Sequence, residues 1–314
     1  MSTLNIPSKI SPRDDALQIH RAFKGLGCDT DVIVNILGHR DASQRDDIQQ
    51  EYETMFSDEL RKRLSSELHG HLKKAVLLWM KSPVERDVSA IKRALKGAII
   101  DLKAATEIIC SRTSSQIRQI KQAYTSTYGN RLENDVDEYT SGNHKKLLLA
   151  YLSTTRYEGP EIDTVLVEDD AKTIRKAGQK HSGVDERTFI HIFSERSRAH
   201  LVALDSTYRQ MFGLNLRRAI KKEASGNFKY GLLTILHCAY NPAQFYAVVL
   251  RKAMKGLGTK DTTLIRVIVT RAEFDMQLVM AEFHKKYRKT LADAVHSETS
   301  GQYRVFLLSL LGST

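Results

Sequence analysis

The feature that most constrains the fold of this 314-residue chain is a set of residue types that recurs four times at fixed spacing. In each copy an arginine is followed by aromatic residues 12 and 16 positions later, by leucine 20 positions later and by glycine 30 positions later. The four sets are Arg40, Tyr52, Phe56, Leu60 and Gly70; Arg112, Tyr124, Tyr128, Leu132 and Gly142; Arg196, Tyr208, Phe212, Leu216 and Gly226; and Arg271, Phe283, Tyr287, Leu291 and Gly301. Because glycine averages about 7% of residues, four glycines at one chosen offset have a chance probability of order 10⁻⁵. The chain therefore consists of four copies of one structural unit.

The residue pattern within each copy is that of α-helices. Apolar residues before the arginine are spaced by three and four, as in Ile33, Ile36 and Leu37, which places them on one buried face. The two aromatic residues, the leucine and the aliphatic residue after it are spaced by four and continue one face for about four turns. Prolines stand near the starts of the copies rather than inside them, and no strand-like alternation of useful length occurs. We expect an all-α protein of four homologous repeats.

The spacing of the recurring arginines also predicts where the repeats divide. Successive arginines are 72, 84 and 75 residues apart, and the extra residues of the middle interval fall at 153–164. That segment contains Tyr-Glu-Gly-Pro, which is typical of a linker. We predict a short N-terminal tail at 1–11 and repeats at 12–82, 83–158, 159–241 and 242–314.

Charge and cysteine content limit the classes of partner and compartment. With 48 Lys and Arg against 37 Asp and Glu, the formal net charge is +11, which indicates an anionic partner such as nucleic acid or an acidic lipid surface. Three cysteines without framework spacing are expected to be thiols in a reducing compartment. No apolar segment has the length of a signal peptide core or a membrane span, so a cytoplasmic protein is expected.

Two of the copies share a loop and a distant acid that suit a hard cation. The loop reads Lys-Gly-Leu-Gly at 24–27 in copy one and at 255–258 in copy four, and Glu67 and Glu298 each lie 42 residues after the first glycine of their loop. Paired glycines let the backbone turn sharply and aim successive carbonyl oxygens at one point. Ca²⁺ binds such oxygens together with a carboxylate and waters, and a lipid phosphate could replace the waters.

The other two copies serve as a comparison. Copy two has Gly-Ala-Ile at 97–99 and Tyr139 at the acidic position, so both halves of the pattern are lost together. Copy three has His-Ser-Gly at 181–183 and keeps Glu223. The alternative interpretation is that the glycines only form a turn into the next helix. The joint presence of loop and acid in copies one and four favours the cation site, and the role of Glu223 stays open.

Lys-Gly-Leu-Gly and an Ile-Leu-x-x-Arg helix, within a unit that occurs four times, resemble the annexin family over residues 12–312. Val-Leu-Leu-Trp at 76–79 and Thr-Arg-Tyr-Glu-Gly at 155–159 resemble the plant branch of that family. The resemblance implies five helices per repeat, a right-handed superhelix and four repeats that form a curved disc. It also implies Ca²⁺-dependent binding to acidic phospholipid membranes through the convex face of the disc.

The resemblance further implies the ligands of two calcium sites. They are the carbonyl oxygens of Phe23, Gly25 and Gly27 with the carboxylate of Glu67, and the carbonyl oxygens of Met254, Gly256 and Gly258 with the carboxylate of Glu298. Leu26 and Leu257, between the glycines, are either shallow lipid contacts at the membrane interface or simple loop residues. Cys28 departs from the threonine usual after the second glycine, which affects auxiliary contacts of the first site.

Two further groups of residues also match features of the family. Cys110 and Cys238 match cysteines of plant annexins that have been suggested to lie close together and respond to redox state, and the alternative is two small buried apolar side chains. Four charged residues resemble those that line the central hydrophilic pore of the family: Asp87, Glu107, Arg112 and Arg266. Structural ion pairs between repeat pairs would explain these four equally well.

Together these features predict a Ca²⁺-dependent, reversible peripheral membrane adaptor rather than an enzyme, cytoplasmic and recruited to acidic phospholipid membranes. One alternative is a helical-repeat scaffold or nucleic-acid binder that acts through its basic surface, with nucleic acid the less favoured partner. Another is a haem peroxidase with His39 as the haem ligand, an activity proposed for some plant annexins. Actin is left open as a protein partner.

Overall fold

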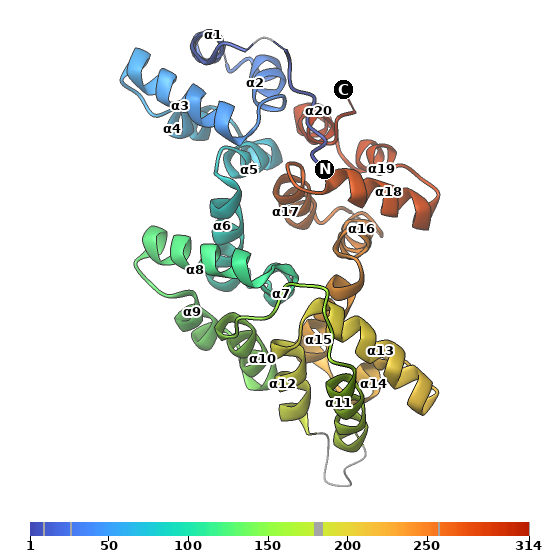
Figure 1. The fold of residues 1–314 in the computed structure, drawn as a ribbon. Coiled ribbons are helices and arrows are strands. Elements are labelled where there is room, and N and C mark those ends of the chain that lie inside the picture. Colours follow the sequence, from blue (N-terminus) through green and yellow to red (C-terminus); the bar gives the residue numbers. More distant parts are fainter. Residues whose placement is uncertain (9, 26, 179–184, 257, 314) are drawn as a thin grey trace. The chain divides into compact units, whose positions relative to one another are not determined.

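The computed structural model describes residues 1–314 except 9, 26, 179–184, 257 and 314 (Figure 1). The described part of the chain contains twenty α-helices and no strands. The prediction of an all-α protein is confirmed.

Each repeat contains five helices. Repeat one has α1 (Pro12–Ala22), α2 (Thr30–Leu37), α3 (Ala42–Phe56), α4 (Leu60–Glu67) and α5 (Gly70–Trp79). Repeat two has α6 (Pro83–Lys96), α7 (Leu102–Ser111), α8 (Ser114–Tyr128), α9 (Leu132–Tyr139) and α10 (Gly142–Ser153). Repeat three has α11 (Thr164–Ala177), α12 (Glu186–Glu195), α13 (Arg198–Phe212), α14 (Leu216–Glu223) and α15 (Gly226–Tyr240). Repeat four has α16 (Pro242–Ala253), α17 (Asp261–Arg271), α18 (Met276–Tyr287), α19 (Leu291–Glu298) and α20 (Gly301–Leu310).

The residues that recur in the sequence mark the same points of every repeat. The second aromatic residue ends the third helix, the leucine begins the fourth helix and the glycine begins the fifth. The leucines and the first aromatic residues are buried, so they hold the third and fourth helices against the core. Each of the four glycines has a φ between +55° and +60°, a left-handed conformation that glycine adopts without strain, so the turn into the fifth helix favours glycine.

The recurring arginine forms an ion pair, largely shielded from solvent, in every repeat. The pairs are Arg40–Asp15 at 2.7 Å, Arg112–Asp87 at 2.7 Å, Arg196–Asp170 at 2.6 Å and Arg271–Asp275 at 2.6 Å. In the first three repeats the acid lies on the first helix of the repeat. In repeat four Tyr246 stands at that place, the guanidinium carbon of Arg271 lies 4.8 Å from its ring centroid, and Asp275 supplies the carboxylate instead.

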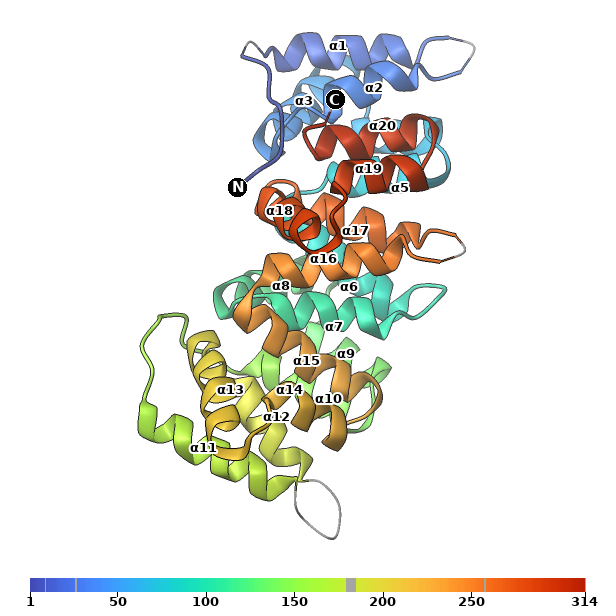
Figure 2. The same ribbon diagram turned by 90° about the vertical axis from the view of Figure 1, so that its right-hand side faces the viewer.

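The chain divides into two compact units, each containing two repeats. The first unit comprises residues 1–86 and 246–314, and the second comprises residues 87–245. In the first unit α5 packs against α17 and α20, and α20 also packs against α2. In the second unit α10 packs against α12 and α15, and α15 also packs against α7. Each unit therefore joins its two repeats through their second and fifth helices (Figures 1 and 2).

A buried tryptophan between two arginines occupies the junction of repeats one and four. The guanidinium carbons of Arg45 and Arg86 lie 3.7 and 4.1 Å from the ring centroid of Trp79. The indole N–H of Trp79 donates to the carbonyl of Leu37 at 2.8 Å. Glu273 accepts hydrogen bonds from both arginines, at 3.3 and 2.5 Å, so a carboxylate of repeat four compensates the buried charges of Arg45 in repeat one and Arg86 at the start of repeat two.

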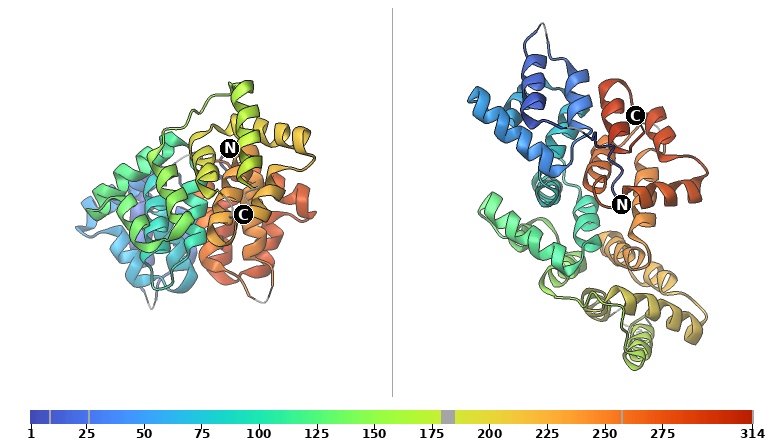
Figure 3. Two further views of the ribbon diagram at one scale, coloured as in Figure 1. Left: turned by 90° about the horizontal axis from the view of Figure 1, so that it is seen from below. Right: turned by 45° about the horizontal axis from the view of Figure 1, so that its top comes forward.

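The N-terminal residues run beside the last helices of the same unit (Figure 3). The N–H of Thr3 donates to the carbonyl of Ala272 at 3.1 Å, and its hydroxyl donates to the carbonyl of Leu310 at 2.5 Å. The terminal ammonium of Met1 donates to the carbonyl of Phe274 at 2.7 Å. The start of the predicted tail is therefore held on repeat four.

Candidate metal centre

The loop between the first and second helices has the same hydrogen bond at its base in all four repeats. A backbone N–H just before the second helix donates to the carbonyl of the alanine near the end of the first. The pairs are Asp29–Ala22 at 2.9 Å, Asp101–Ala94 at 2.9 Å, Asp185–Ala177 at 3.3 Å and Lys260–Ala253 at 2.8 Å. The loops of repeats one, two and four are equal in length, and that of repeat three is one residue longer. The two loops of the first unit lie on the same side of that unit (Figure 2).

The backbone of the glycine loops takes conformations that other residues avoid. Gly27 has a φ of +97°, and Gly258 at the equivalent place has a φ of +85°. Gly256 also has a positive φ, of +115°, whereas Gly25 does not. These glycines have no Cβ, so the loop can turn without steric strain and leave its carbonyl groups available to a ligand. Leu26 and Leu257 lie outside the described residues.

Buried side chains anchor the start of each loop. Phe23 follows α1 and is 6% exposed, and its ring meets that of Tyr52 edge-on, with the centroids 6.3 Å apart. Met254 follows α16, is 3% exposed, and its N–H donates to the carbonyl of Leu250 at 3.2 Å. The main chain of both residues is therefore fixed by the packing of the first helix.

The acids predicted to face these loops are the last residues of the fourth helices. In repeat four the hydroxyl of Thr259 donates to a carboxylate oxygen of Glu298 at 3.0 Å, so loop and acid meet directly. In repeat one the carboxylate of Glu67 pairs instead with Arg63, at 2.9 Å. Burial, followed by the charges of Glu67 and Asp29, raises the pKa of the Cys28 thiol to about 11, which is consistent with Cys28 lying near that acid.

Repeats two and three differ from this arrangement in ways that the structure explains. Ile99 takes the place of Gly27, and it is not among the described residues with a positive φ, so the loop of repeat two has another backbone path. Its side chain is 85% exposed. In repeat three Glu223 packs against Gly178, where a Cβ would lie 3.1 Å from its carboxyl carbon, and pairs with Lys222 at 3.4 Å. His181, Ser182 and Gly183 lie outside the described residues.

Two residues that matter here were not selected as site residues from the sequence alone. Thr259 contacts Glu298, and Arg63 contacts Glu67. Each occupies a position where the internal alignment of the repeats shows a difference: Thr259 aligns with Cys28, and Arg63 aligns with Ala294. These differences between aligned repeats were the signal that could have identified the residues, because a different side chain near a proposed ligand changes the contacts of that ligand.

The residues compared with a central pore divide between the two units. Asp87 and Arg112 form an ion pair with each other inside repeat two, whereas the ion-pair alternative placed such pairs between repeat pairs. Glu107, also in that unit, accepts a hydrogen bond from the hydroxyl of Tyr230. Arg266 is a buried residue of the first unit, 6% exposed.

The predicted redox pair is buried in the second unit. Cys110 and Cys238 are free thiols, and their helices α7 and α15 pack together. Burial, and then the neighbouring Cys238, raises the pKa of the Cys110 thiol, so that thiol is neutral at physiological pH. His39, the haem candidate, donates its ring N–H at Nδ1 to the carbonyl of Asn35 at 2.8 Å.

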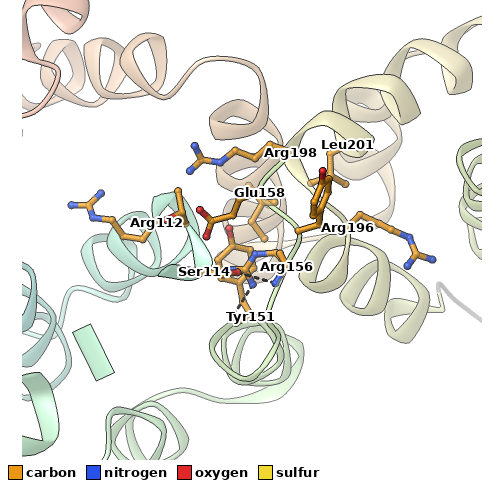
Figure 4. A pocket seen from close by; sticks show the side chains of 11 residues that line it. Arg112, Ser114, Tyr151, Arg156, Glu158, Arg196, Arg198 and Leu201 are labelled. Carbon is orange, nitrogen blue, oxygen red and sulfur yellow. Dashed lines mark hydrogen bonds between the residues drawn. The ribbon is translucent and has the colours of Figure 1, made fainter. Parts of the chain in front are cut away.

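A pocket of about 120 Å³ in the second unit is lined by four arginines, but their charges are already engaged (Figure 4). Arg112 and Arg196 pair with aspartates, and Arg198 donates to the carbonyl of Ser111 at 2.6 Å. Arg156 donates to the carbonyl of Tyr151 at 2.7 Å. Glu158 accepts a hydrogen bond from the N–H of Ser115 at 2.8 Å, so its carboxylate already occupies the N-terminus of α8. The polar groups that line the pocket therefore serve to pack the 153–164 linker against its neighbours.

The donor set predicted for the two glycine loops, main-chain oxygens and one carboxylate, is of the kind that suits a hard cation such as Ca²⁺. Among the described residues no group of three or more His, Cys, Asp and Glu side chains could hold a metal ion. Within the same residues, no helix combines the length and the apolar composition needed to cross a bilayer.

Comparisons with known proteins agree with the repeat pattern. The sequence model of the annexin family matches residues 14–79, 86–151, 169–235 and 245–310. The chain is 61% identical to "Annexin D5" of Arabidopsis thaliana over 313 residues, which cover 99% of each protein. Its structure resembles "Annexin III", with a TM-score of 0.95 and 35% identity over 99% of this chain and 97% of that one. It also resembles a calcium-bound annexin (Sm)1, with a TM-score of 0.84 and 27% identity over 99% and 93% of the two chains.

Proposed function

The chain belongs to the annexin family and is of the plant type, and on that premise we propose that it attaches reversibly to membranes of acidic phospholipid when Ca²⁺ is bound at the loops of repeats one and four. It acts as a peripheral adaptor recruited from the cytoplasm, and binding rather than catalysis is its activity. The observation that carries the proposal is the contact between Thr259 and Glu298, because it joins a glycine loop to an acid 39 residues away.

The residues of each loop have separate parts in this proposal. Gly27 and Gly258 permit the turn that leaves carbonyl oxygens free for a cation. Phe23 and Met254 anchor the start of each loop in the core, and Glu67 and Glu298 add one negative charge apiece. Bound Ca²⁺ supplies positive charge that the protein oxygens share with the phosphate oxygens of a lipid. Ca²⁺ therefore links the protein to the membrane.

Vesicle co-sedimentation tests the proposal. The full chain is mixed with phosphatidylserine and phosphatidylcholine vesicles, in Ca²⁺ or in a chelator. We expect the double variant Glu67→Gln and Glu298→Gln to lose Ca²⁺-dependent sedimentation, with a free energy of unfolding within about 0.5 kcal/mol of the parent because neither carboxylate is buried. Glu223→Gln is the matched control and should sediment like the parent. Unchanged Ca²⁺-dependent sedimentation of the double variant would refute the assignment.

The same assay separates the alternative functions. Sedimentation that survives the chelator and disappears at high salt would assign binding to the net charge of +11. Competition by nucleic acid under those conditions would favour the nucleic-acid alternative. A haem absorbance band that is lost in His39→Ala would favour the peroxidase.

A further inference from the structure

The two proposed calcium sites carry the same loop, but their carboxylates have different partners. The carboxylate of Glu67 forms an ion pair with Nη2 of Arg63, with an N–O distance of 2.9 Å, and the side chains of Glu67 and Arg63 are 22% and 41% exposed. Glu298 accepts from the neutral hydroxyl of Thr259 at 3.0 Å. The partner of Glu67 is therefore positively charged, whereas the partner of Glu298 is neutral.

The difference comes from two positions of the repeat. Arg63 lies one turn before Glu67 on α4, where repeat four has Ala294 on α19. Cys28 takes the place of Thr259, and a thiol is a much weaker hydrogen-bond donor than a hydroxyl. Repeat four therefore lacks the competing charge and has the orienting hydroxyl.

The position of Arg63 is supported by a second contact. Its guanidinium carbon lies 5.7 Å from the ring centroid of Phe23, the residue whose carbonyl is a proposed ligand. The positive charge therefore sits beside both parts of the first site, the acid and the start of the loop. A divalent ion that binds at this site must replace Arg63 as the partner of Glu67, and the guanidinium of Arg63 repels it.

We propose that Arg63 is an internal competitor for Glu67, so that the loop of repeat one binds Ca²⁺ more weakly than the loop of repeat four. The inference rests on the proposed function of the two loops. As Ca²⁺ rises, repeat four fills first and repeat one follows. A partly exposed i,i+4 pair and a screened repulsion together correspond to a difference in affinity of roughly three- to tenfold.

Single-site proteins test this inference. Glu298→Gln leaves only the first site and Glu67→Gln leaves only the fourth, and Ca²⁺ binding to each is measured by calorimetry in the presence of vesicles. We expect the first site to need three- to tenfold more Ca²⁺ for half-saturation. Adding Arg63→Ala should remove most of that difference in the Glu298→Gln protein and change nothing in the Glu67→Gln protein. Arg63→Lys, which keeps the charge, should keep the first site weak.

Lys62→Ala provides a matched control. It removes one positive charge from the same helix, but Lys62 is 75% exposed and pairs with Glu59 rather than Glu67. Equal effects of Lys62→Ala and Arg63→Ala would overturn the inference, because net charge would then explain both. Equal half-saturation of the two single-site proteins, unaffected by Arg63→Ala, would also overturn it. An absence of Ca²⁺ binding in both single-site proteins would overturn the proposed function itself.

Discussion

At the scale of single residues, the recurring arginine of each repeat is held by an ion pair that is largely shielded from solvent. Arg40 is 7% exposed and Asp15 is 4% exposed, and two hydrogen bonds of 2.7 and 2.8 Å join them. Removing one partner of a shielded pair leaves the other charge uncompensated, which is more costly than losing the attraction alone. We expect Asp15→Asn to lower the free energy of unfolding by about 2 to 4 kcal/mol, measured by urea denaturation. The neighbouring Asp14 is exposed, so Asp14→Asn should change it by less than about 0.5 kcal/mol. Equal effects of the two changes would contradict this.

A buried histidine predicts how stability depends on pH. Burial lowers the pKa of His144 from 6.5 to about 4, and Nε2 lies 2.8 Å from the hydroxyl oxygen of Thr106. Between those two pH values the unfolded chain binds a proton that the folded chain does not, so stability falls as the pH decreases from about 6.5 to 4. The other repeats have Leu72, Phe228 and Tyr303 at this position. We expect His144→Leu to remove about 2 to 3 kcal/mol of that acid-dependent loss in urea denaturation series. An unchanged dependence of stability on pH in His144→Leu would contradict this prediction.

The residues of the candidate site could be predicted from residue types at fixed offsets, but the partners of their side chains could not. The internal alignment identified the glycines, the acids and the loss of both in repeat two. It did not reveal that Arg63 pairs with Glu67, because an i,i+4 contact depends on the rotamers that the packing selects. Nor did it show that Asp275 replaces the missing acid of repeat four, since the replacement comes from the residue just before α18 and not from the first helix of the repeat.

At the scale of elements, the loop of repeat two lacks both the glycine conformation and the acid of the proposed cation site, so it can test whether an acid alone is sufficient. Tyr139 ends α9 where Glu67 ends α4, and Ile99 stands where Gly27 has its left-handed φ. A β-branched residue resists that conformation, so the carbonyl groups of this loop cannot follow the same path. We expect Tyr139→Glu to add no Ca²⁺ equivalent in calorimetry. Ile99→Gly combined with Tyr139→Glu should add a weak one. An added equivalent in the single variant would show that the loop conformation is not limiting.

The helix boundaries were the part of the fold most open to prediction, because the same residues set them in each repeat. The recurring leucine begins every fourth helix, and the recurring glycine begins every fifth. The linker at 153–164 was predicted from the length of the middle interval and from its Tyr-Glu-Gly-Pro segment, but its packing was not predicted. Arg156 caps the end of α10 through the carbonyl of Tyr151, and Glu158 caps the start of α8. Both contacts join residues of different elements, and a local pattern carries no signal for them.

At the scale of the whole molecule, both proposed sites belong to the first unit and their loops lie on one side of it (Figure 2). Two weak sites in one compact unit bind a membrane far more tightly than either site alone, because the second contact forms at a high effective concentration. We expect Glu298→Gln to raise the Ca²⁺ concentration for half-maximal vesicle sedimentation by at least about tenfold, although one site remains. The titration should also become less steep. Glu67→Gln should raise that concentration by less, because the site that it removes is the weaker one. If either single variant titrated like the parent chain, the two loops would not be acting together, and attachment through one loop would be sufficient.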